Sequence, residues 1–434
     1  MQEGKPKGLL IAAPQSGAGK TTVTLALLRA LKNAGREIVS AKSGPDYIDP
    51  KFHEAASGLT CINLDAWAMT PETVRALGRS HAETADLLIV EGAMGLFDGA
   101  ANGRGSAADL SACLGVPVVL VVDCSKQAQS VAALVNGFRT FRPDVTVAGV
   151  ILNKVGSPRH EKMLRDALAP LPISVLGALP RMDGLVLPER HLGLVQAEEH
   201  GDLDSFLDQA AALCAERIDL HALAGLASPL ARPQEPAAVL PPLGQRIAIA
   251  RDVAFAFSYP HVLAGWREAG ANVSFFSPLA DELPDPDADA IFLPGGYPEL
   301  HAGALAAASK FRKAMREAAA DGTLIYGECG GYMALGEGLI DAQGARHEML
   351  GLLPLETSFA QRKRHLGYRV LSPLSDLPWT RELAAHEFHY ATTQREGNAE
   401  RLFAATDAEG TAVADMGLRA GSVMGSFAHV IGLR

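Results

Sequence analysis

Residues 9–22 read LLIAAPQSGAGKTT, and this stretch decides the fold of the first half of the chain. A predicted strand, Gly8–Ala12, runs into a loop of small residues and then into a predicted helix, Thr22–Asn33. Glycines let backbone N–H groups approach phosphate oxygens closely, and a helix N-terminus adds donors and partial positive charge. The pattern therefore predicts a nucleotide phosphate site. Its strict form has Gly where Pro14 stands, so the loop is a variant, and a plain Gly-rich turn is the alternative.

The residue types in this loop predict particular contacts with ATP. Lys20 would reach the β- and γ-phosphates, and the hydroxyl of Thr21 would ligate Mg²⁺. Asn153, which follows another predicted strand, would read an adenine edge, on a signal that is weak by itself. The residues predicted to bind ATP are Ser16, Gly17, Gly19, Lys20, Thr21, Thr22 and Asn153.

The order of apolar and amphipathic stretches predicts two α/β domains. Runs that are apolar on both faces and separated by helices, such as the one predicted over Lys126–Phe141, indicate a parallel sheet with helices on both sides. A second, more strand-rich series follows. The predicted strands are Gly8–Ala12, Ile38–Lys42, Leu87–Glu91, Val118–Asp123, Val147–Asn153 and Ser174–Ala178, then Arg246–Arg251, Asn272–Ser277, Ala290–Leu293 and Thr323–Tyr326.

A proline-rich stretch separates the two series. Between Ser228 and Gln245 the chain carries Pro229, Pro233, Pro236, Pro241 and Pro242, a composition that disfavours helix and sheet. A length of 434 residues also suits two domains of ordinary size. We therefore predict domains over residues 1–222 and 245–434, joined by an extended linker over 223–244.

Composition excludes several classes of protein. A net charge of -10 argues against a general nucleic-acid binder, and 48% hydrophobic with 20% charged residues is an ordinary globular balance. The apolar run Val116–Val122 is too short to span a bilayer, and Met1–Leu10 contains no signal core. The five cysteines are scattered without zinc spacing. These features predict a cytoplasmic protein without a membrane or nucleic-acid partner.

Acidic residues follow two of the predicted strands. Glu91 ends the strand Leu87–Glu91, at the edge where open α/β sheets place their ligands, and is a candidate Mg²⁺ ligand. The loop after Ile38–Lys42 contains Asp46 and Asp49, which would hold metal or orient substrate, and Tyr47, which would stack on a ring. The alternatives are an acidic strand cap and an ordinary turn of Gly, Pro and Asp.

A second motif predicts an activated thiol. Residues 323–332 read TLIYGECGGY, so a strand ends in Gly327-Glu328-Cys329-Gly330-Gly331. This pattern is that of a nucleophile elbow with Cys in place of Ser. The helix start that follows is expected to lower the pKa of the Cys329 thiol. The alternative is a buried cysteine in a Gly-rich turn.

A thiol nucleophile needs a base and a site for the oxyanion. The sequence alone does not choose the base among seven histidines of the second half. The paired glycines Gly295 and Gly296 follow a predicted strand and would aim backbone N–H groups at an oxyanion, unless they form a simple turn. The candidate bases are His261, His301, His347, His365, His386, His389 and His429.

The two motifs in this order resemble a known family, the a,c-diamide synthases of cobyrinic and hydrogenobyrinic acid. The first half is also similar to dethiobiotin synthetase, and the second half to class I glutamine amidotransferases. The resemblance covers nearly the whole chain. The matching segments are SGAGKTT (16–22), SGPDYIDP (43–50), EGAMGLFDG (91–99), PERHLGL (188–194), PGGYPELH (294–301), YGECGGYM (326–333) and SFAHV (426–430).

The resemblance implies a role for each matching residue. Cys329 is implied as the nucleophile that attacks glutamine, His429 as its base, and Gly295 and Gly296 as the oxyanion site. The implied metal residues are Thr21, Asp46 and Glu91, and the implied substrate residues are Tyr47, Asp49, Arg190 and His191. One position departs from the class I pattern, because Ile431 stands where a Glu usually follows the catalytic His. A Cys–His dyad is the better description, and what orients His429 stays open.

The implied activity is amidation of the a and c acetates of hydrogenobyrinic or cobyrinic acid, with ATP and Mg²⁺ as cofactors and L-glutamine as nitrogen donor. Three alternatives stay open. They are amidation of other corrin carboxylates, as by a cobyric acid synthase, amidation of a different large acid such as a cell-wall precursor, and a P-loop ATPase switch without amidase activity. The sequence fixes neither the cobalt content of the substrate nor the oligomeric state, for which a homodimer is one option.

Overall fold

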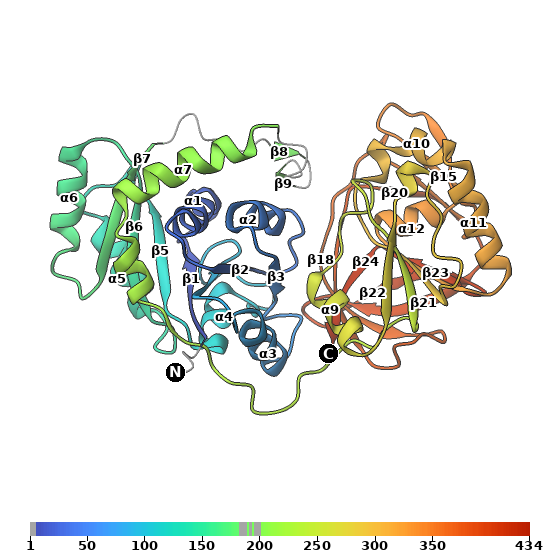
Figure 1. Cartoon of the computed structure of the whole chain (residues 1–434), viewed down its shortest axis with the longest axis horizontal. Coiled ribbons are helices and arrows are strands. Elements are labelled where there is room, and N and C mark those ends of the chain that lie inside the picture. Colours follow the sequence, from blue (N-terminus) through green and yellow to red (C-terminus); the bar gives the residue numbers. More distant parts are fainter. Residues whose placement is uncertain (1–5, 182–188, 191–192, 195–200) are drawn as a thin grey trace. The chain divides into compact units, whose positions relative to one another are not determined.

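The computed structural model describes residues 6–181, 189–190, 193–194 and 201–434. The chain forms two compact units, Met1–Ala237 and Ala238–Arg434. Each unit is built around its own sheet (Figure 1). None of the described helices is long and apolar enough to cross a bilayer.

The sheet of the first unit has the strand order β3-β2-β4-β1-β5-β6-β7, and all neighbours in this order are parallel. Its central strands are buried on both faces, which explains their uninterrupted apolar sequences. A short strand, β10, pairs antiparallel with the start of β1. The strands are β1 (Lys7–Ala12), β2 (Ile38–Ser43), β3 (Cys61–Leu64), β4 (Leu87–Glu91), β5 (Val118–Asp123), β6 (Val147–Val155), β7 (Ser174–Pro180) and β10 (Ser228–Pro229). A separate two-stranded sheet joins β8 (Glu189–Arg190) to β9 (Gly193–Leu194).

Helices cover both faces of this sheet (Figure 1). The helices α1, α2 and α7 lie on one face, and α3 and α4 lie on the other. Residues 23–31 of α1 are buried because α7 covers this helix. The side chains of Asp204 and Asp208, on α7, pair with Arg29 of α1. The helices are α1 (Lys20–Asn33), α2 (Asp49–Ser57), α3 (Pro71–His81), α4 (Ala107–Leu114), α5 (Val131–Thr140), α6 (Pro158–Leu168), α7 (Leu203–Arg217) and α8 (Leu220–Gly225).

Three local features differ from what the sequence predicts. The helix expected over Lys126–Phe141 begins later, at Val131, because residues before it form turns in which Gln127 contacts His160. The sequence does not predict strand β3, because its four residues, CINL, show no periodic pattern of apolar side chains. The helix α8 and the strand β10 fall partly or wholly within residues 223–244, where composition predicts an extended linker. The predicted division into domain ranges stays a prediction.

The second unit contains a mixed sheet that curls back on itself. Its order is β12-β11-β13-β14-β23-β22-β21-β18-β19-β24, parallel from β12 to β23 and antiparallel beyond. Strand β24 follows β23 after one residue, Phe427, yet lies at the far end of this order. Because only Phe427 joins them, β24 at the end of the strand order lies next to β23 in its middle.

Apolar clusters pack both faces of this sheet, with α12, the helices α10 and α11 and a smaller sheet on one side. The strands of the main sheet are β11 (Arg246–Ala250), β12 (Asn272–Phe276), β13 (Ala290–Leu293), β14 (Leu324–Glu328), β18 (His365–Pro373), β19 (Leu383–His389), β21 (Glu400–Thr406), β22 (Ala412–Ala420), β23 (Val423–Ser426) and β24 (Ala428–Leu433). The smaller sheet has β15 (Gly338–Ile340), β16 (Arg346–Glu348), β17 (Leu355–Ser358) and β20 (Thr392–Glu396), and the helices are α9 (Pro260–Glu268), η2 (Pro278–Ala280), η3 (Pro298–Leu300), α10 (Ala302–Ala307), α11 (Ser309–Ala320) and α12 (Gly330–Leu335).

The capping box of α4 gives a test of local stability. The Ser106 hydroxyl accepts the Asp109 backbone N–H, and the Asp109 carboxylate accepts the Ser106 N–H. We expect Ser106→Ala to lower the free energy of unfolding by about 1 kcal/mol in urea titrations. The exposed Ser80→Ala on α3 is the control and should change it by less than about 0.5 kcal/mol. Equal effects of the two changes would contradict the capping role.

Candidate active sites

The phosphate loop lies between β1 and α1. Gly19 adopts the left-handed conformation with φ 84°, and an added Cβ there would lie 2.4 Å from the Nδ2 atom of Asn153. Ser16 and Gly17 are exposed, whereas Lys20, Thr21 and Thr22 are half-buried at the start of the helix. The loop is therefore open to solvent at Ser16 and Gly17, and only glycine fits at position 19.

Residues at the end of β6 hold this loop in place. Asn153 donates its amide to the Ala18 carbonyl at 2.9 Å, and Lys154 donates to the Gly17 carbonyl at 2.9 Å. Lys154 also pairs with Asp123 at the end of β5, at 2.7 Å. The structure thus gives Asn153 a role in tethering the loop, and its contact with an adenine edge stays a prediction.

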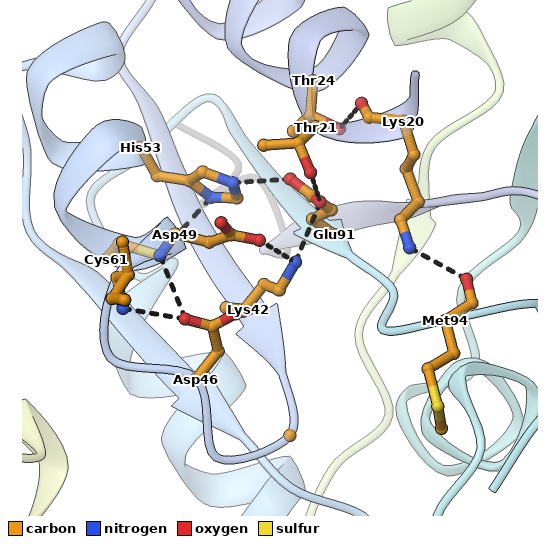
Figure 2. A network of polar contacts seen from close by, with 12 residues as sticks. Lys20, Thr21, Thr24, Lys42, Asp46, Asp49, His53, Cys61, Glu91 and Met94 are labelled. Carbon is orange, nitrogen blue, oxygen red and sulfur yellow. Dashed lines mark hydrogen bonds and ion pairs between the residues drawn. The ribbon is translucent and has the colours of Figure 1, made fainter. Parts of the chain in front are cut away.

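A buried carboxylate, Glu91, lies beneath the loop at the end of β4 (Figure 2). Its Oε1 atom accepts from the Thr21 hydroxyl at 2.8 Å and from Lys42 Nζ at 2.9 Å. Its Oε2 atom lies 2.7 Å from Nε2 of His53. Burial opposes ionisation, but Lys42 and His53 hold the pKa of Glu91 well below its usual range. The carboxylate is therefore ionised at neutral pH.

Lys42 and His53, the partners of Glu91, are members of the site that the sequence did not predict. Lys42 is almost fully buried and joins Glu91 to Asp49, whose Oδ2 atom lies 2.5 Å from its Nζ. Burial disfavours the ammonium form, yet the two carboxylates raise the pKa of Lys42 above its usual value. The available signal for Lys42 was a lysine at the end of an otherwise apolar strand, where a charge needs a partner. No such signal marked His53, which lies within α2.

Asp46 lies in the loop that leads into α2, and Asp49 is the first residue of that helix. The Oδ1 atom of Asp46 accepts the backbone N–H groups of Ile48 and Asp49, at 2.7 and 3.1 Å. Burial and the neighbouring Asp49 raise the pKa of Asp46 to about 6. The two hydrogen bonds that Asp46 accepts from the backbone shape the turn before α2. Tyr47 is half-buried between the two acids.

These groups form a donor set of the kind that Mg²⁺ prefers. The Thr21 hydroxyl and the Glu91 carboxylate are in contact, and Asp46 and Asp49 lie close enough to share the field of Lys42. Hydroxyl and carboxylate oxygens next to a phosphate loop suit Mg²⁺. The predicted metal residues Thr21, Asp46 and Glu91 thus gather at one edge of the sheet.

Lys20 extends from the phosphate loop towards the segment after β4. Its ammonium donates to the Met94 carbonyl at 3.0 Å (Figure 2). Burial and the nearby Lys42 lower the pKa of Lys20 to about 8. Of the remaining predicted substrate residues, Arg190 has its backbone in β8, and His191 lies outside the described residues.

The turn at Cys329 has the geometry of an elbow. Strand β14 ends at Glu328, and α12 begins at Gly330, so the chain reverses direction within Cys329. Cys329 has φ 45° and ψ -102°, a conformation that non-glycine residues rarely adopt and that costs free energy. Its backbone N–H donates to the Ser426 carbonyl at 2.8 Å, which ties the turn to β23.

The prediction that the helix start lowers the pKa of the Cys329 thiol is wrong. The side chain is buried, and burial raises its pKa above the usual range, with further contributions from Glu299, Glu328 and Glu387. Helix α12 has six residues, so its dipole is too short to outweigh burial among carboxylates. The thiol is therefore protonated in the ligand-free protein, and ionisation needs a base.

One of the seven candidate histidines, His429, lies against the loop that contains Gly295. An added Cβ at Gly295 would lie 2.3 Å from Cε1 of His429, so the absence of a side chain there makes room for the imidazole. A Cβ added at Gly330, the residue after the thiol, would lie 3.0 Å from the backbone nitrogen of Gly296. Cys329, Gly295, Gly296 and His429 therefore come together at one end of the sheet.

His429 is buried and neutral. Burial lowers its pKa to about 3, with the neighbouring His386 and His389 acting in the same direction. A neutral imidazole has a lone pair and can accept the thiol proton. His261 is instead occupied by the Ile431 carbonyl at 2.9 Å, and His347 by Asp341 at 2.8 Å.

Comparisons with known proteins match both halves of the chain. A family model described as the CobQ/CobB/MinD/ParA nucleotide binding domain matches residues 9–195. A model described as the CobB/CobQ-like glutamine amidotransferase domain matches residues 246–434. A hydrogenobyrinate a,c-diamide synthase of Brucella anthropi is 63% identical over 428 residues, 98% of this chain and 98% of that protein.

This chain belongs to the hydrogenobyrinate a,c-diamide synthase family. Other members include those of Rhizobium meliloti, 60% identical over 98% of this chain and 99% of that protein, and of Mesorhizobium japonicum, 52% identical over 98% of both. Membership confirms the resemblance inferred from the motifs, the α/β fold class, and the prediction of a glutamine-dependent, amide-forming ligase.

The buried ion pair of Lys42 gives a test of the first site in this family member. Lys42→Met leaves Glu91 and Asp49 without their cation, and we expect the free energy of unfolding to fall by about 3–5 kcal/mol. Mg²⁺ should restore more stability to this variant than to the unsubstituted protein, because a cation bound to the native state replaces the lost charge.

The measurement is urea unfolding with and without Mg²⁺. The control is Lys51→Met, which removes a more exposed ion pair with Glu54 and should cost about 0–1 kcal/mol with no change in the response to Mg²⁺. If the two lysine variants lost the same stability, the Lys42 pair would not be the main neutraliser of the site.

Proposed function

We propose that this chain uses ATP and glutamine to convert the a and c acetate carboxylates of hydrogenobyrinate into carboxamides. The observation that supports this most strongly is the pairing of two sites in one chain, a phosphate loop over a buried acidic cluster and a cysteine elbow beside a neutral histidine. Relatives that are 52–63% identical to this chain are named for the substrate hydrogenobyrinate, which supports the same substrate here.

In the second unit, the proposed reaction releases ammonia from glutamine. Cys329 transfers its proton to His429 and attacks the side-chain carbonyl, while the N–H groups of Gly295 and Gly296 stabilise the oxyanion. His429 then returns the proton to the departing nitrogen, and a glutamyl thioester stays on the sulfur. Water hydrolyses the thioester to glutamate and restores the thiol.

In the first unit, the proposed reaction activates a carboxylate. Oxide is a poor leaving group, so the γ-phosphate of ATP is transferred to the carboxylate, and the acyl phosphate formed has a good leaving group. Lys20 is placed to neutralise the transferring phosphoryl group, and Mg²⁺, held by Thr21, Asp46 and Glu91, would supply further positive charge. Ammonia then displaces phosphate and forms the amide.

The finer assignments belong to this proposal. Tyr47, Asp49, Arg190 and His191 would contact the corrin-type substrate, and Ser16, Gly17, Gly19, Thr22 and Asn153 would contact ATP. The five free cysteines suit a reducing compartment, and we place the reaction in the cytoplasm. Assembly into a homodimer stays an open option.

The alternatives differ in how well they agree with the comparisons. An ATPase switch would leave the amidotransferase match over residues 246–434 without a function. A cobyric acid synthase would share both domain types, but the relatives that span the chain are named for the a,c-diamide of the cobalt-free ring. The diamide of hydrogenobyrinate is therefore preferred over cobyrinic acid and over later corrin carboxylates.

Separate sites for releasing and using nitrogen predict a split between two nitrogen sources. Cys329→Ser should lose glutamine-dependent synthesis and glutaminase activity, and should keep synthesis with ammonium salt at raised pH, where free ammonia is available. Lys20→Ala should lose synthesis from both sources. Mass spectrometry of hydrogenobyrinate after incubation with ATP and Mg²⁺ counts the amides formed.

Three results would overturn the proposal. The first is glutamine-dependent synthesis that survives Cys329→Ser, because a group other than Cys329 would then release the ammonia. The second is a product with more than two new amides, and the third is a much higher activity with cobyrinic acid than with hydrogenobyrinate. Unchanged circular dichroism of each variant is the control for folding.

A further inference from the structure

The second site lacks an acid at the position where class I amidotransferases usually carry one. That position is Ile431, whose side chain is almost fully buried. A histidine that acts as a base needs a partner on its other ring nitrogen, because the partner fixes the tautomer and stabilises the imidazolium. Among the described residues, two buried glutamates lie near His429, namely Glu328 and Glu387.

Glu328 is placed against His429 by the curled sheet. It is the last residue of β14 and directly precedes Cys329, and its Oε2 atom lies 3.8 Å from Nδ1 of His429. Its Oε1 atom accepts the backbone N–H of Val430 at 3.0 Å. The phenol of Tyr326, on the same strand, also contacts this carboxyl group. The carboxyl group thus connects the strand of the thiol to the strand of the base.

Glu387 is already committed to other partners. Its Oε2 atom accepts from Arg369, with Nη2 at 2.7 Å, and its Oε1 atom lies 3.0 Å from Nε2 of His389. Two cation-forming groups therefore share this carboxylate on the β18–β19 side. Glu387 acts on His429 through its field, whereas Glu328 lies next to the ring nitrogen itself.

We propose that Glu328 is the positioning carboxylate of the glutaminase site and takes the place of the acid that Ile431 lacks. Glu328 holds His429 with the proton on Nδ1, so that Nε2 receives the proton of the Cys329 thiol. The separation of 3.8 Å closes to a hydrogen bond when glutamine binds and the imidazolium forms. This inference rests on the proposed roles of Cys329 and His429.

The charge of Glu328 gives the site a pH dependence. Burial raises the pKa of Glu328 to about 8, so the group is mostly neutral at pH 7 and ionises as the pH rises. Ionised Glu328 stabilises the imidazolium, and this stabilisation is lost as the pH falls below about 8. The titratable and charged groups around the pair are Tyr259 and His261 at α9, Glu299 on η3, Tyr326 and Cys329 at β14, Arg369 on β18, and His386, Glu387 and His389 on β19.

The test is glutaminase kinetics of Glu328→Gln as a function of pH. The amide keeps the shape of the side chain, but its NH₂ group donates to Nδ1 and forces the proton onto Nε2, the wrong nitrogen for a base. We expect kcat to fall by roughly 10²-fold or more, with KM for glutamine within about twofold. The rise of kcat with pH near 8 should disappear, whereas synthesis from ammonia should be unchanged.

Two further glutamates serve as comparisons. Glu356→Gln, on β17 of the smaller sheet, removes a carboxylate that pairs with Arg346 and should leave kcat and the pH profile unchanged. Glu387→Gln should keep the rise of kcat with pH near 8. The proposal is overturned if Glu328→Gln keeps the wild-type kcat and pH profile, or if Glu387→Gln removes the rise instead.

Glu328→Asp keeps the inference testable if the glutamine variant does not fold. Aspartate keeps the carboxyl group but places it one methylene further from His429, so kcat should fall while its rise with pH is kept. An unchanged kcat would contradict the role of Glu328. Cys329→Ser separates this inference from the function beneath it. If the serine variant keeps glutaminase activity, the proposed nucleophile is wrong; if it loses activity and Glu328→Gln does not, only the role of Glu328 is wrong.

Discussion

Both sites depend on one constraint, the direction of parallel strands. In a parallel sheet all strands end at the same edge, so the loops that follow them meet there. In the first unit this edge collects the phosphate loop after β1, Lys42 from β2 and Glu91 from β4. In the second it collects the Gly295 loop after β13, the Cys329 turn after β14 and the end of β23. The candidate functional residues of each half therefore lie at this edge, where the chain leaves the sheet.

The two halves treat a buried glutamate in opposite ways. Glu91 and Glu328 both end a central parallel strand and are both nearly inaccessible to solvent. Glu91 meets a lysine and a histidine, which keep its negative charge. Glu328 meets the backbone N–H of Val430, the phenol of Tyr326 and a neutral imidazole, none of which is a cation, so burial dominates and its pKa rises. The same residue type thus becomes a fixed anion in one site and a titrating group in the other, according to its partners.

Much of the fold and part of the sites follow from local sequence. Six strands of the first sheet (β1, β2, β4, β5, β6 and β7), the glycine at position 19 and the turn at Cys329 are visible because apolar runs and Gly-rich loops are local signals. The role of Lys42 was missed because its partners Glu91 and Asp49 come from other segments. The pKa of Cys329 was misjudged because burial is a property of the assembled unit. The resemblance alone implied His429, because its position beside Gly295 depends on where β24 joins the sheet, which no local pattern encodes.

The placement of β24 links the assembly of the protein to its order of synthesis. Translation proceeds from the N-terminus, and domains tend to fold as they emerge from the ribosome. The first unit is complete about two hundred residues before the strand that carries His429 has been made. The nascent chain therefore contains the whole nucleotide-binding unit well before it contains every residue of the glutaminase site.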